Sequence, residues 1–344
     1  MSANLFNWSK PATIQPNNFK YKSLSNWSFN TAVGCAHACR FCYVPEVSTN
    51  KMGEKLATHG VADPDAQWGE YVGVRAWNEA AFLASLKRAE ETPLADLKPD
   101  GNRAVMFCTT TDPYQVLGGV HGKQHAAMVR RALELILERS TLNVRILTRS
   151  PLARVDFDMM KRFGHRLLFG MSLPTLDDRL ARIYEPHAPS PTRRLECLTA
   201  AKAAGLHVYV AVAPTYPECG PRDIDRTLEV VAGLKPVTVF MEPINIRAEN
   251  VERIRAHAAS IGEKVNMEPF ESREKWLFYA LGALHRSEIS GRIHGLPMHL
   301  WPDASMGGKV SLDHLEHATG TKADVLKAWM EGHWNKISAW PQTH

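Results

Sequence analysis

Three of the six cysteines lie close together, at Cys35, Cys39 and Cys42, in the segment GCAHACRFCYVPE. Thiolates at this spacing could bind zinc, hold an iron–sulfur cluster or form a disulfide. The chain shows no signal-peptide pattern, and it has no run of about 18 apolar residues that could cross a membrane. We therefore expect a cytoplasmic protein without a membrane partner, in which reducing conditions disfavour a disulfide framework.

The other cysteines, Cys108, Cys197 and Cys219, lie far from this group and from one another in the sequence. His37 could complete a four-ligand zinc site, but structural zinc sites usually pair two short ligand hairpins. Three cysteines on a [4Fe–4S] cube instead leave one iron without a protein ligand, where another molecule can bind. The spacing favours the iron–sulfur cluster and leaves zinc as an alternative.

Short apolar segments alternate with helix-like segments along most of the chain, as in successive βα units of a parallel sheet. The expected strands span residues 27–33, 104–111, 143–150, 167–174, 207–214 and 237–244. The expected helices between them have apolar residues three and four apart and span 122–140, 154–164, 192–205 and 222–235. Six strands predict an α/β fold with a partial (β/α)6 TIM-type barrel, although a doubly wound open sheet would show the same alternation.

The composition along the chain predicts three parts. Residues 1–30 form an N-terminal extension, residues 31–250 the core barrel, and residues 251–344 a helical C-terminal extension. Within the core, residues 48–101 are polar and have the character of an insertion, with a helix expected over residues 78–91.

Polar or turn-forming clusters follow the strands of the core, as TTTDPY, TRSP, SLPT, APTYPE and EPIN. The carboxyl ends of parallel strands carry the site in such folds, so these clusters should face one cavity. Ordinary loop chemistry is the alternative, because Pro, Thr and Asp also form turns.

The spacing Cys35-x3-Cys39-x2-Cys42, with Phe41 and Tyr43 beside the third cysteine, resembles the signature of the radical S-adenosylmethionine (SAM) superfamily. The segments TTTDPYQ, ILTRS, MSLPTLDDRLARIYEPHAPSPTRRLECLTAAKAAG and VAVAPTYP resemble the branch of spore photoproduct lyase and "DNA repair photolyase" proteins. The resemblance implies a [4Fe–4S] cluster on the three cysteines and SAM on the open iron. It also implies a 5′-deoxyadenosyl radical that abstracts a substrate hydrogen, and an electron donor such as flavodoxin or ferredoxin.

The same resemblance implies contacts to SAM. Phe41 and Tyr43 would contact the adenine, and the Tyr43 ring could equally pack at the mouth of the barrel. Thr109, Thr110 and Asp112 would hold the amino group, while the alternative for Asp112 is to cap the turn before the following proline.

Two arginines are expected near the methionine carboxylate. Arg149 follows the third core strand, and a guanidinium suits bidentate pairing with a carboxylate. Its alternative is a surface ion pair. Arg194 is a second candidate for the same carboxylate, and Ser172 is expected to contact the ribose.

Cys108 is a candidate hydrogen donor, because its segment FCTTTD resembles the one that carries the donor cysteine of spore photoproduct lyase. A thiol can return a hydrogen atom to a product radical. The alternative is a buried core thiol, since free cysteines are among the most buried residues. Cys219 is a rival donor, and Cys197 on a helix is expected in the core.

A formal net charge of +5 is compatible with a polyanionic partner. The resemblance and this charge favour a nucleobase or nucleic acid as substrate, with a peptide or small metabolite as the second hypothesis. A zinc-binding nucleic-acid module is the alternative outside enzymes. In the histidine-rich tail, His314 and His317 could join a second metal site, but a lid or a substrate-facing extension is favoured.

Overall fold

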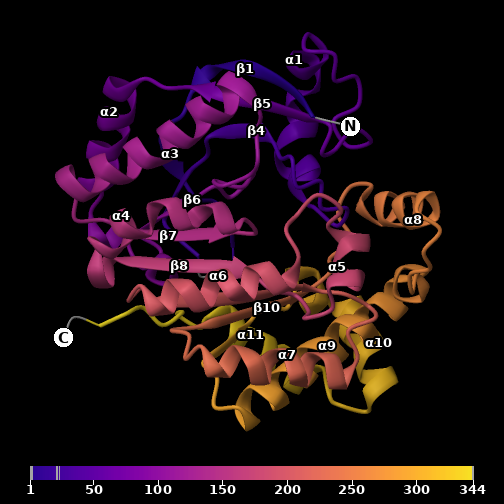
Figure 1. Ribbon diagram of the computed structural model, residues 1–344. Helices are drawn as coiled ribbons and strands as arrows, with labels where there is room; N and C mark the ends of the chain where they lie inside the picture. Colours follow the sequence, from indigo (N-terminus) through magenta and orange to yellow (C-terminus); the bar gives the residue numbers. More distant parts are fainter. Residues whose placement is uncertain (1–2, 21, 23, 343–344) are drawn as a thin grey trace.

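An open sheet of eight strands forms the centre of the structure, a computed structural model that describes residues 3–20, 22 and 24–342. Its order is β11 (Met298–Leu300), β10 (Val239–Pro243), β9 (Val208–Thr215), β8 (Leu167–Ser172), β7 (Asn143–Thr148), β6 (Ala104–Phe107), β3 (Trp27–Phe29) and β2 (Ile14–Pro16). All neighbours from β3 to β11 are parallel, and β2 runs antiparallel to β3. The edges β2 and β11 do not pair with each other, so the predicted α/β fold with a partial TIM-type barrel is confirmed (Figure 1).

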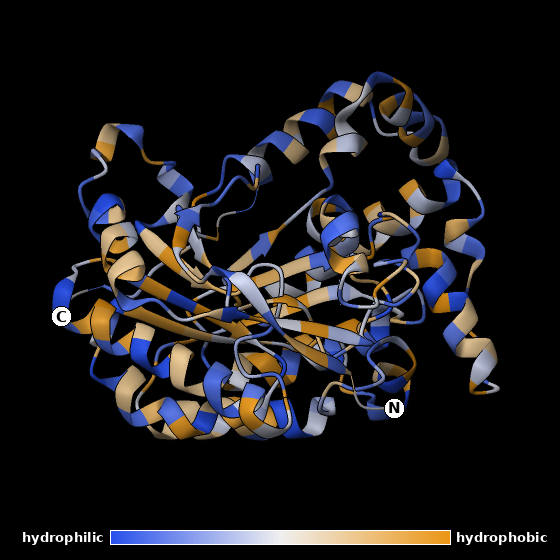
Figure 2. Ribbon diagram, turned by 90° about the horizontal axis from the view of Figure 1, so that it is seen from above, coloured by the Kyte–Doolittle hydropathy of each residue, from blue (hydrophilic) through white to orange (hydrophobic). Residues whose placement is uncertain are grey.

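Helices follow the parallel strands and pack against the sheet (Figure 1). Those of the core are α3 (Gly119–Arg139), α4 (Phe157–Lys161), α5 (Asp178–Tyr184), α6 (Pro191–Ala203) and α7 (Pro221–Gly233). The later helices are α8 (Asn250–Ser260), α9 (Arg273–Ile293), α10 (Lys309–Thr319) and α11 (Ala323–Trp334). Apolar residues concentrate in the central strands, whereas the surrounding helices carry both polar and apolar residues (Figure 2).

A second sheet, which the sequence analysis missed, joins the N-terminal extension to the 48–101 segment. It contains β1 (Asn4–Pro11), β5 (Tyr71–Ala76) and β4 (Ala32–Gly34), with β1 parallel and β4 antiparallel to β5. The 48–101 segment also contains α1 (Gly53–Ala57) and α2 (Glu79–Glu90). The polar sequence of β1 gave no clear strand pattern, because only one of its residues is fully buried.

The expectation of one strand over residues 27–33 is corrected. This segment divides into β3 and β4, which lie in different sheets. The chain leaves the main sheet at Asn30 and Thr31, and the Thr31 carbonyl accepts a hydrogen bond from the Arg75 amide at 3.0 Å. This change of sheet places the residues after β4 above the carboxyl edge of the main sheet.

The C-terminal region adds a seventh parallel strand, β11, to the six that were expected. Its three residues are all buried, but so short a segment gives no reliable periodicity. None of the helices in the described part of the chain is long and apolar enough to span a bilayer. The three-part division of the chain stays a prediction.

Candidate active site

A cavity of about 430 Å³ lies at the carboxyl ends of the parallel strands. Its wall includes residues from the carboxyl-terminal parts of β8 and β9 and residues that follow β6, β7 and β10, so the polar strand ends do share one cavity. The predicted site residues that line it are Cys35, Cys39, Phe41, Cys42, Tyr43, Cys108, Thr109, Thr110, Asp112, Arg149 and Ser172. Arg194 and Cys219 do not line it.

The three clustered cysteines lie on the loop that follows β4. Cys35 and Cys39 are only 9% and 6% exposed, and Cys42 is half-buried. Gly34 begins the loop with a φ of 88°, and a Cβ atom there would lie 2.3 Å from the Tyr71 carbonyl oxygen. Only glycine fits this turn without moving the backbone, and the turn brings the cysteines to the cavity.

Two residues of α8 donate hydrogen bonds to the backbone of this loop. The Arg253 guanidinium donates to the carbonyls of Cys42 and Arg40, and the Asn250 amide donates to the Phe41 carbonyl at 3.1 Å. Arg253 in turn pairs with Asp65. The sequence predicts the helix but not this contact, because the contact joins residues more than 200 positions apart.

The TTTDPYQ segment also forms hydrogen bonds with the backbone around this loop. The Gln115 side chain accepts from the Ala36 amide and donates to Thr111, both at 2.7 Å. The Thr111 hydroxyl donates to the Gly34 carbonyl at 2.6 Å. The segment after β6 and helix α8 therefore both hold the cysteine loop in place.

Burial raises the pKa of all three thiols, to about 12 for Cys39. The nearby cation of Arg149 opposes this rise for Cys39 and Cys42, and Arg253 opposes it for Cys42. Binding of a metal or cluster would therefore release protons from these thiols.

Three soft thiolate donors on one cavity wall fit a cluster with one open iron. Among the described residues, no three His, Cys, Asp or Glu side chains already surround a single metal position, so the sulfurs would converge on binding. His37, the candidate fourth zinc ligand, is buried and lies 3.2 Å from an Asp112 oxygen. The donor set thus fits the iron–sulfur cluster better than zinc.

Asp112 is surrounded by donors from its own chain. Its carboxylate accepts from the Tyr114 amide, the Thr148 hydroxyl and the Arg149 amide at 2.7–2.8 Å. Burial acts to raise the pKa of this carboxyl, but His37 and these hydrogen bonds outweigh it and lower the pKa to about 2. Its contacts match the turn-capping alternative, and its role toward SAM stays a prediction.

Glu185 is a buried carboxylate between two guanidiniums. Arg149 donates to it through Nε at 2.8 Å, and Arg194 pairs with its other oxygen. Arg149 also faces the cavity and lies 5.5 Å from the centre of the Phe41 ring. Arg194 is fully buried, away from the cavity wall, and donates to the carbonyls of Pro189 and Ser172. These contacts fit a structural role, and its expected contact with SAM stays a prediction.

Replacing Glu185 by Gln is expected to lower the free energy of unfolding by about 3–5 kcal/mol, because it leaves the buried Arg194 guanidinium and the partly exposed Arg149 guanidinium without a carboxylate partner. Urea denaturation measures this change. Glu263→Gln is the matched control, because Glu263 pairs with Arg179, whose side chain is 79% exposed, and little change is expected there. Equal losses for the two variants would contradict the structural role of Glu185.

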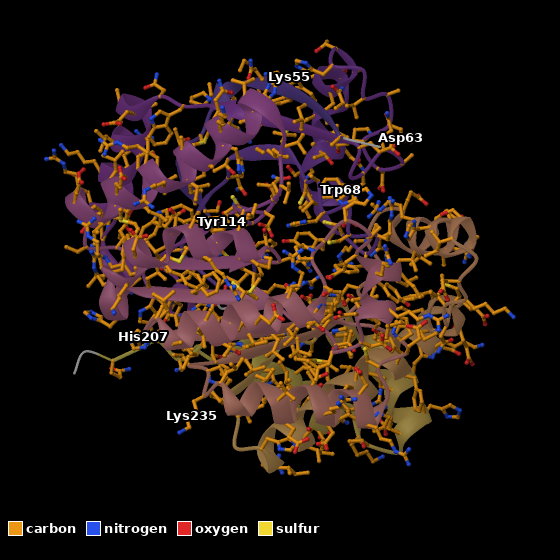
Figure 3. All side chains as sticks on the ribbon, viewed as in Figure 1. Lys55, Asp63, Trp68, Tyr114, His207 and Lys235 are labelled. Carbon is orange, nitrogen blue, oxygen red and sulfur yellow. The ribbon has the colours of Figure 1, made fainter. Side chains whose placement is uncertain are left out.

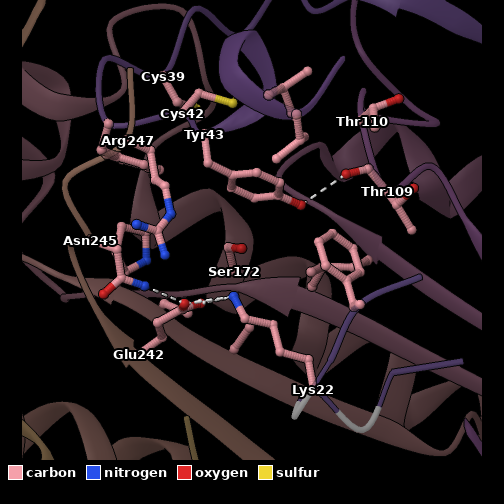
Figure 4. A pocket seen from close by; sticks show the side chains of 18 of the residues that line it. Lys22, Cys39, Cys42, Tyr43, Thr109, Thr110, Ser172, Glu242, Asn245 and Arg247 are labelled. Carbon is pink, nitrogen blue, oxygen red and sulfur yellow. Dashed lines mark hydrogen bonds and ion pairs between the residues drawn. The ribbon is translucent and has the colours of Figure 1, made fainter. Parts of the chain in front are cut away.

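The remaining predicted residues divide between the cavity and the core. The Tyr43 hydroxyl donates to the Thr109 carbonyl at 3.0 Å, and the Thr110 amide donates to Asn30 at 2.9 Å, so the strand end after β6 is held in place (Figure 4). Cys219 is 2% exposed and lies against the Pro174 carbonyl, outside the cavity. Its role as a rival hydrogen donor is therefore not supported by its position.

The opposite wall was largely missed by the sequence analysis. Lys22 pairs with Glu242 at 2.6 Å, and the Asn245 amide donates to the same carboxylate at 2.6 Å (Figure 4). The Lys22 ammonium lies 5.8 Å from the Tyr43 ring and 5.3 Å from the Trp301 ring. The EPIN strand end signalled part of this wall, but no local pattern signalled Lys22.

Trp68 and part of the C-terminal tail also line the cavity. Trp68 and Tyr114 lie inside the molecule, whereas Lys55 and Asp63 lie toward its margin (Figure 3). In the C-terminal tail, residues 301–304 line the cavity, which agrees with a substrate-facing extension. His314 pairs with Glu274 at 3.2 Å. Among the described residues, no three His, Cys, Asp or Glu side chains surround a metal position in this tail.

Residues 29–231 match the family model described as the radical SAM superfamily. The chain belongs to the radical SAM superfamily. Membership implies a [4Fe–4S] cluster and SAM as cofactors, in agreement with the cysteine-lined cavity. It also supports an enzyme, without defining its reaction.

Two uncharacterized relatives share this radical SAM sequence. A protein of Acidianus two-tailed virus is 31% identical over 261 residues, which cover 72% of this chain and 79% of the viral protein. A protein of Mycobacterium tuberculosis is 30% identical over 223 residues, which cover 62% of this chain and 58% of the mycobacterial protein. The chain thus spans little more than half of the mycobacterial relative.

Solved structures of spore photoproduct lyase have a similar fold. A point mutant of that radical SAM enzyme has a TM-score of 0.61 at 13% identity, covering 85% of this chain and 80% of the other. A further mutant with bound AdoMet and dinucleoside spore photoproduct has a TM-score of 0.57 at 13% identity, covering 80% and 76%. At this identity the likeness shows a shared fold.

Proposed function

We propose that this chain is a radical SAM enzyme that abstracts a hydrogen atom from a nucleobase or nucleic acid. The observation that carries the proposal is the single cavity that Cys35, Cys39 and Cys42 share with the Cys108 thiol. When bound, the [4Fe–4S] cluster and SAM supply a 5′-deoxyadenosyl radical after one-electron reduction. We infer that Cys35, Cys39 and Cys42 hold the cluster and leave one iron open to SAM.

Side chains around the cysteine loop are suited to bind and orient SAM. Arg149 faces the cavity with a guanidinium that can pair with a carboxylate. The Phe41 and Tyr43 rings offer flat apolar surfaces for an adenine, and Ser172 supplies a polar group at the end of β8. The amino group of SAM is proposed to bind at the strand end at Thr109, whose carbonyl accepts a hydrogen bond from the Tyr43 hydroxyl.

Cys108 is suited to return a hydrogen atom to the product. A carbon radical of the product takes the hydrogen of the S–H bond, which leaves a closed-shell product and a thiyl radical on Cys108. One electron from a low-potential donor such as flavodoxin or ferredoxin, together with one proton, then restores the thiol. The thiol lines the cavity, and burial keeps it protonated by raising its pKa to about 12.

Charge around the cavity supports a nucleic-acid substrate. Lys20 and Lys22 line the cavity opposite the cysteines, and the whole chain carries a formal net charge of +5. The solved structure of spore photoproduct lyase with a dinucleoside has a similar fold and supports the same class. A cytoplasmic location agrees with this proposal and stays a prediction.

A small metabolite or peptide is the second candidate substrate. A cavity of about 430 Å³ is at the lower end of the usual range for small-molecule sites, and it must also take up SAM. The Lys22–Glu242 ion pair further reduces the charge available for phosphates.

The reduced, cluster-loaded protein should convert SAM to 5′-deoxyadenosine faster when it is given ultraviolet-damaged DNA that contains thymine dimers. Chromatography with mass spectrometry measures 5′-deoxyadenosine and repaired thymine in the same sample. Undamaged DNA of the same sequence is the control. Equal 5′-deoxyadenosine with both DNAs and no repaired thymine would contradict lesion repair and favour the small-substrate candidate.

A further inference from the structure

A chain of three buried side chains runs from the cavity wall to α3. The Cys108 sulfur lies 3.3 Å from the Thr31 hydroxyl oxygen, which lies 2.8 Å from His125 Nε2. Exposed fractions are 5% for Cys108, 0% for Thr31 and 2% for His125. The three residues come from the end of β6, the link between β3 and β4, and α3.

The backbone at Cys108 fixes where its thiol lies. Cys108 has a φ of 62°, the left-handed region that non-glycine residues seldom occupy. Its amide donates to the Phe29 carbonyl at 2.9 Å, which anchors this conformation to the neighbouring strand. Such a conformation persists where the surrounding contacts determine it, and it often marks a functional residue.

The distances among the three side chains fit two arrangements of their hydrogen atoms. Burial lowers the pKa of His125 to about 4, so its ring is neutral and carries one N–H group. Burial raises the pKa of Cys108, whereas hydrogen bonds from the hydroxyl and the backbone amide of Thr31 lower it. In the first arrangement His125 Nε2–H donates to the Thr31 oxygen and the Thr31 hydroxyl donates to the sulfur, and in the second the thiol donates to the Thr31 oxygen and the hydroxyl donates to His125. Only the first arrangement leaves the hydrogen of the thiol free to point into the cavity.

We propose that Thr31 and His125 are positioning residues that direct the Cys108 S–H bond into the cavity. In this arrangement His125 Nε2–H donates to the Thr31 oxygen, and the Thr31 hydroxyl donates to the Cys108 sulfur. The use of this orientation for hydrogen return rests on the proposed function. The orientation itself depends only on contacts within the chain.

Other groups also act on the Cys108 sulfur. Asp112 raises the pKa of this thiol, and Arg75 on β5 lowers it. Tyr114 is a further ionisable group in electrostatic contact with the sulfur. Substitutions at Thr31 and His125 leave all three unchanged, so a change in thiol reactivity can be assigned to the proposed chain.

The test measures how fast iodoacetamide alkylates Cys108 in the cluster-loaded protein at several alkaline pH values, by peptide mass spectrometry. Thiolate is the reactive form, so below its pKa the rate follows the thiolate fraction. Thr31→Val should slow alkylation about tenfold, equivalent to a rise of one pKa unit. Thr31→Ser keeps the hydroxyl and should react like the unmodified protein.

His125 is tested by a second pair of variants. His125→Leu should slow alkylation several-fold, because the Thr31 hydroxyl loses the partner that orients it, and His125→Gln should restore part of the rate. If Thr31→Val does not fold, the two His125 variants still test the proposal. Alkylation of Thr31→Val as fast as in the unmodified protein, or equal slowing in Thr31→Ser, would overturn the proposal. An unchanged rate in His125→Leu would overturn the role of His125.

This experiment separates the inference from the proposed function. Alkylation reports the hydrogen bonds at Cys108 without any substrate. If the rates follow the prediction but Cys108 does not deliver hydrogen to product, the hydrogen bonds from Thr31 and His125 stand and the donor role fails. If Cys108 delivers hydrogen while the variants react normally, the donor role stands and the positioning role fails.

Discussion

Replacing Cys35, Cys39 or Cys42 by Ala is expected to reduce bound iron from about four atoms per chain to near background, because three thiolates are the fewest that can hold the cube with one open iron. Formation of 5′-deoxyadenosine from SAM should fall to background in all three variants. Iron and sulfide analysis after anaerobic reconstitution measures the first effect, and chromatography measures the second.

Cys197→Ala is the matched control for these variants. Cys197 is a buried thiol on α6 that does not line the cavity. Its replacement should leave the iron content and 5′-deoxyadenosine formation near those of the unmodified protein. A cluster-ligand variant that retains both iron and SAM cleavage would exclude that cysteine as a ligand.

Cys108→Ala is expected to separate SAM cleavage from product formation. The thiol hydrogen exchanges with solvent, so in heavy water the unmodified enzyme should place one deuterium atom in each product molecule. Without the thiol, 5′-deoxyadenosine should still form, whereas deuterated product should fall to background. Chromatography with mass spectrometry measures the 5′-deoxyadenosine and the deuterium content of the repaired dinucleotide in the same sample.

Cys219→Ala is the control for this experiment, because Cys219 is equally buried but lies against the Pro174 carbonyl outside the cavity. It should retain the deuterium transfer. Deuterated product from Cys108→Ala at the original level would contradict the donor role. Loss of transfer in Cys219→Ala alone would assign that role to Cys219.

The sequence predicted the features that depend on local pattern. Alternating apolar and helical segments predicted the parallel sheet, and its direction predicted that strand ends such as Thr109 and Glu242 face one cavity. The close spacing of Cys35, Cys39 and Cys42 predicted a metal-binding loop, and the structure places all three cysteines on the cavity wall. Each of these signals lies within a few residues, or repeats with the period of a helix or strand.

Contacts between distant segments could not be predicted in the same way. Arg194 has the residue type expected of a carboxylate ligand, yet its guanidinium is used inside the protein by Glu185. Lys22 and Glu242 are 220 positions apart, and only the fold brings them together. Thr31 and His125 gave no signal either, because a buried threonine and a helical histidine are ordinary core residues.

The residue type of Asp112 is compatible with two different roles. A carboxylate at a strand end suits an amino group of a ligand, and it also suits a turn. The structure satisfies this carboxylate with donors from the TTTDPYQ segment and from the end of β7. Its first role is therefore to hold the strand ends around the cavity in their positions.

The most direct test of the central claim is electron paramagnetic resonance of the reduced, reconstituted protein before and after addition of SAM, with metal analysis of the same sample. We predict about four iron atoms per chain and a [4Fe–4S] signal that changes when SAM is added, because SAM binds the open iron. Bound zinc without iron, or a cluster signal that SAM leaves unchanged, would contradict the claim that Cys35, Cys39 and Cys42 hold a SAM-binding cluster.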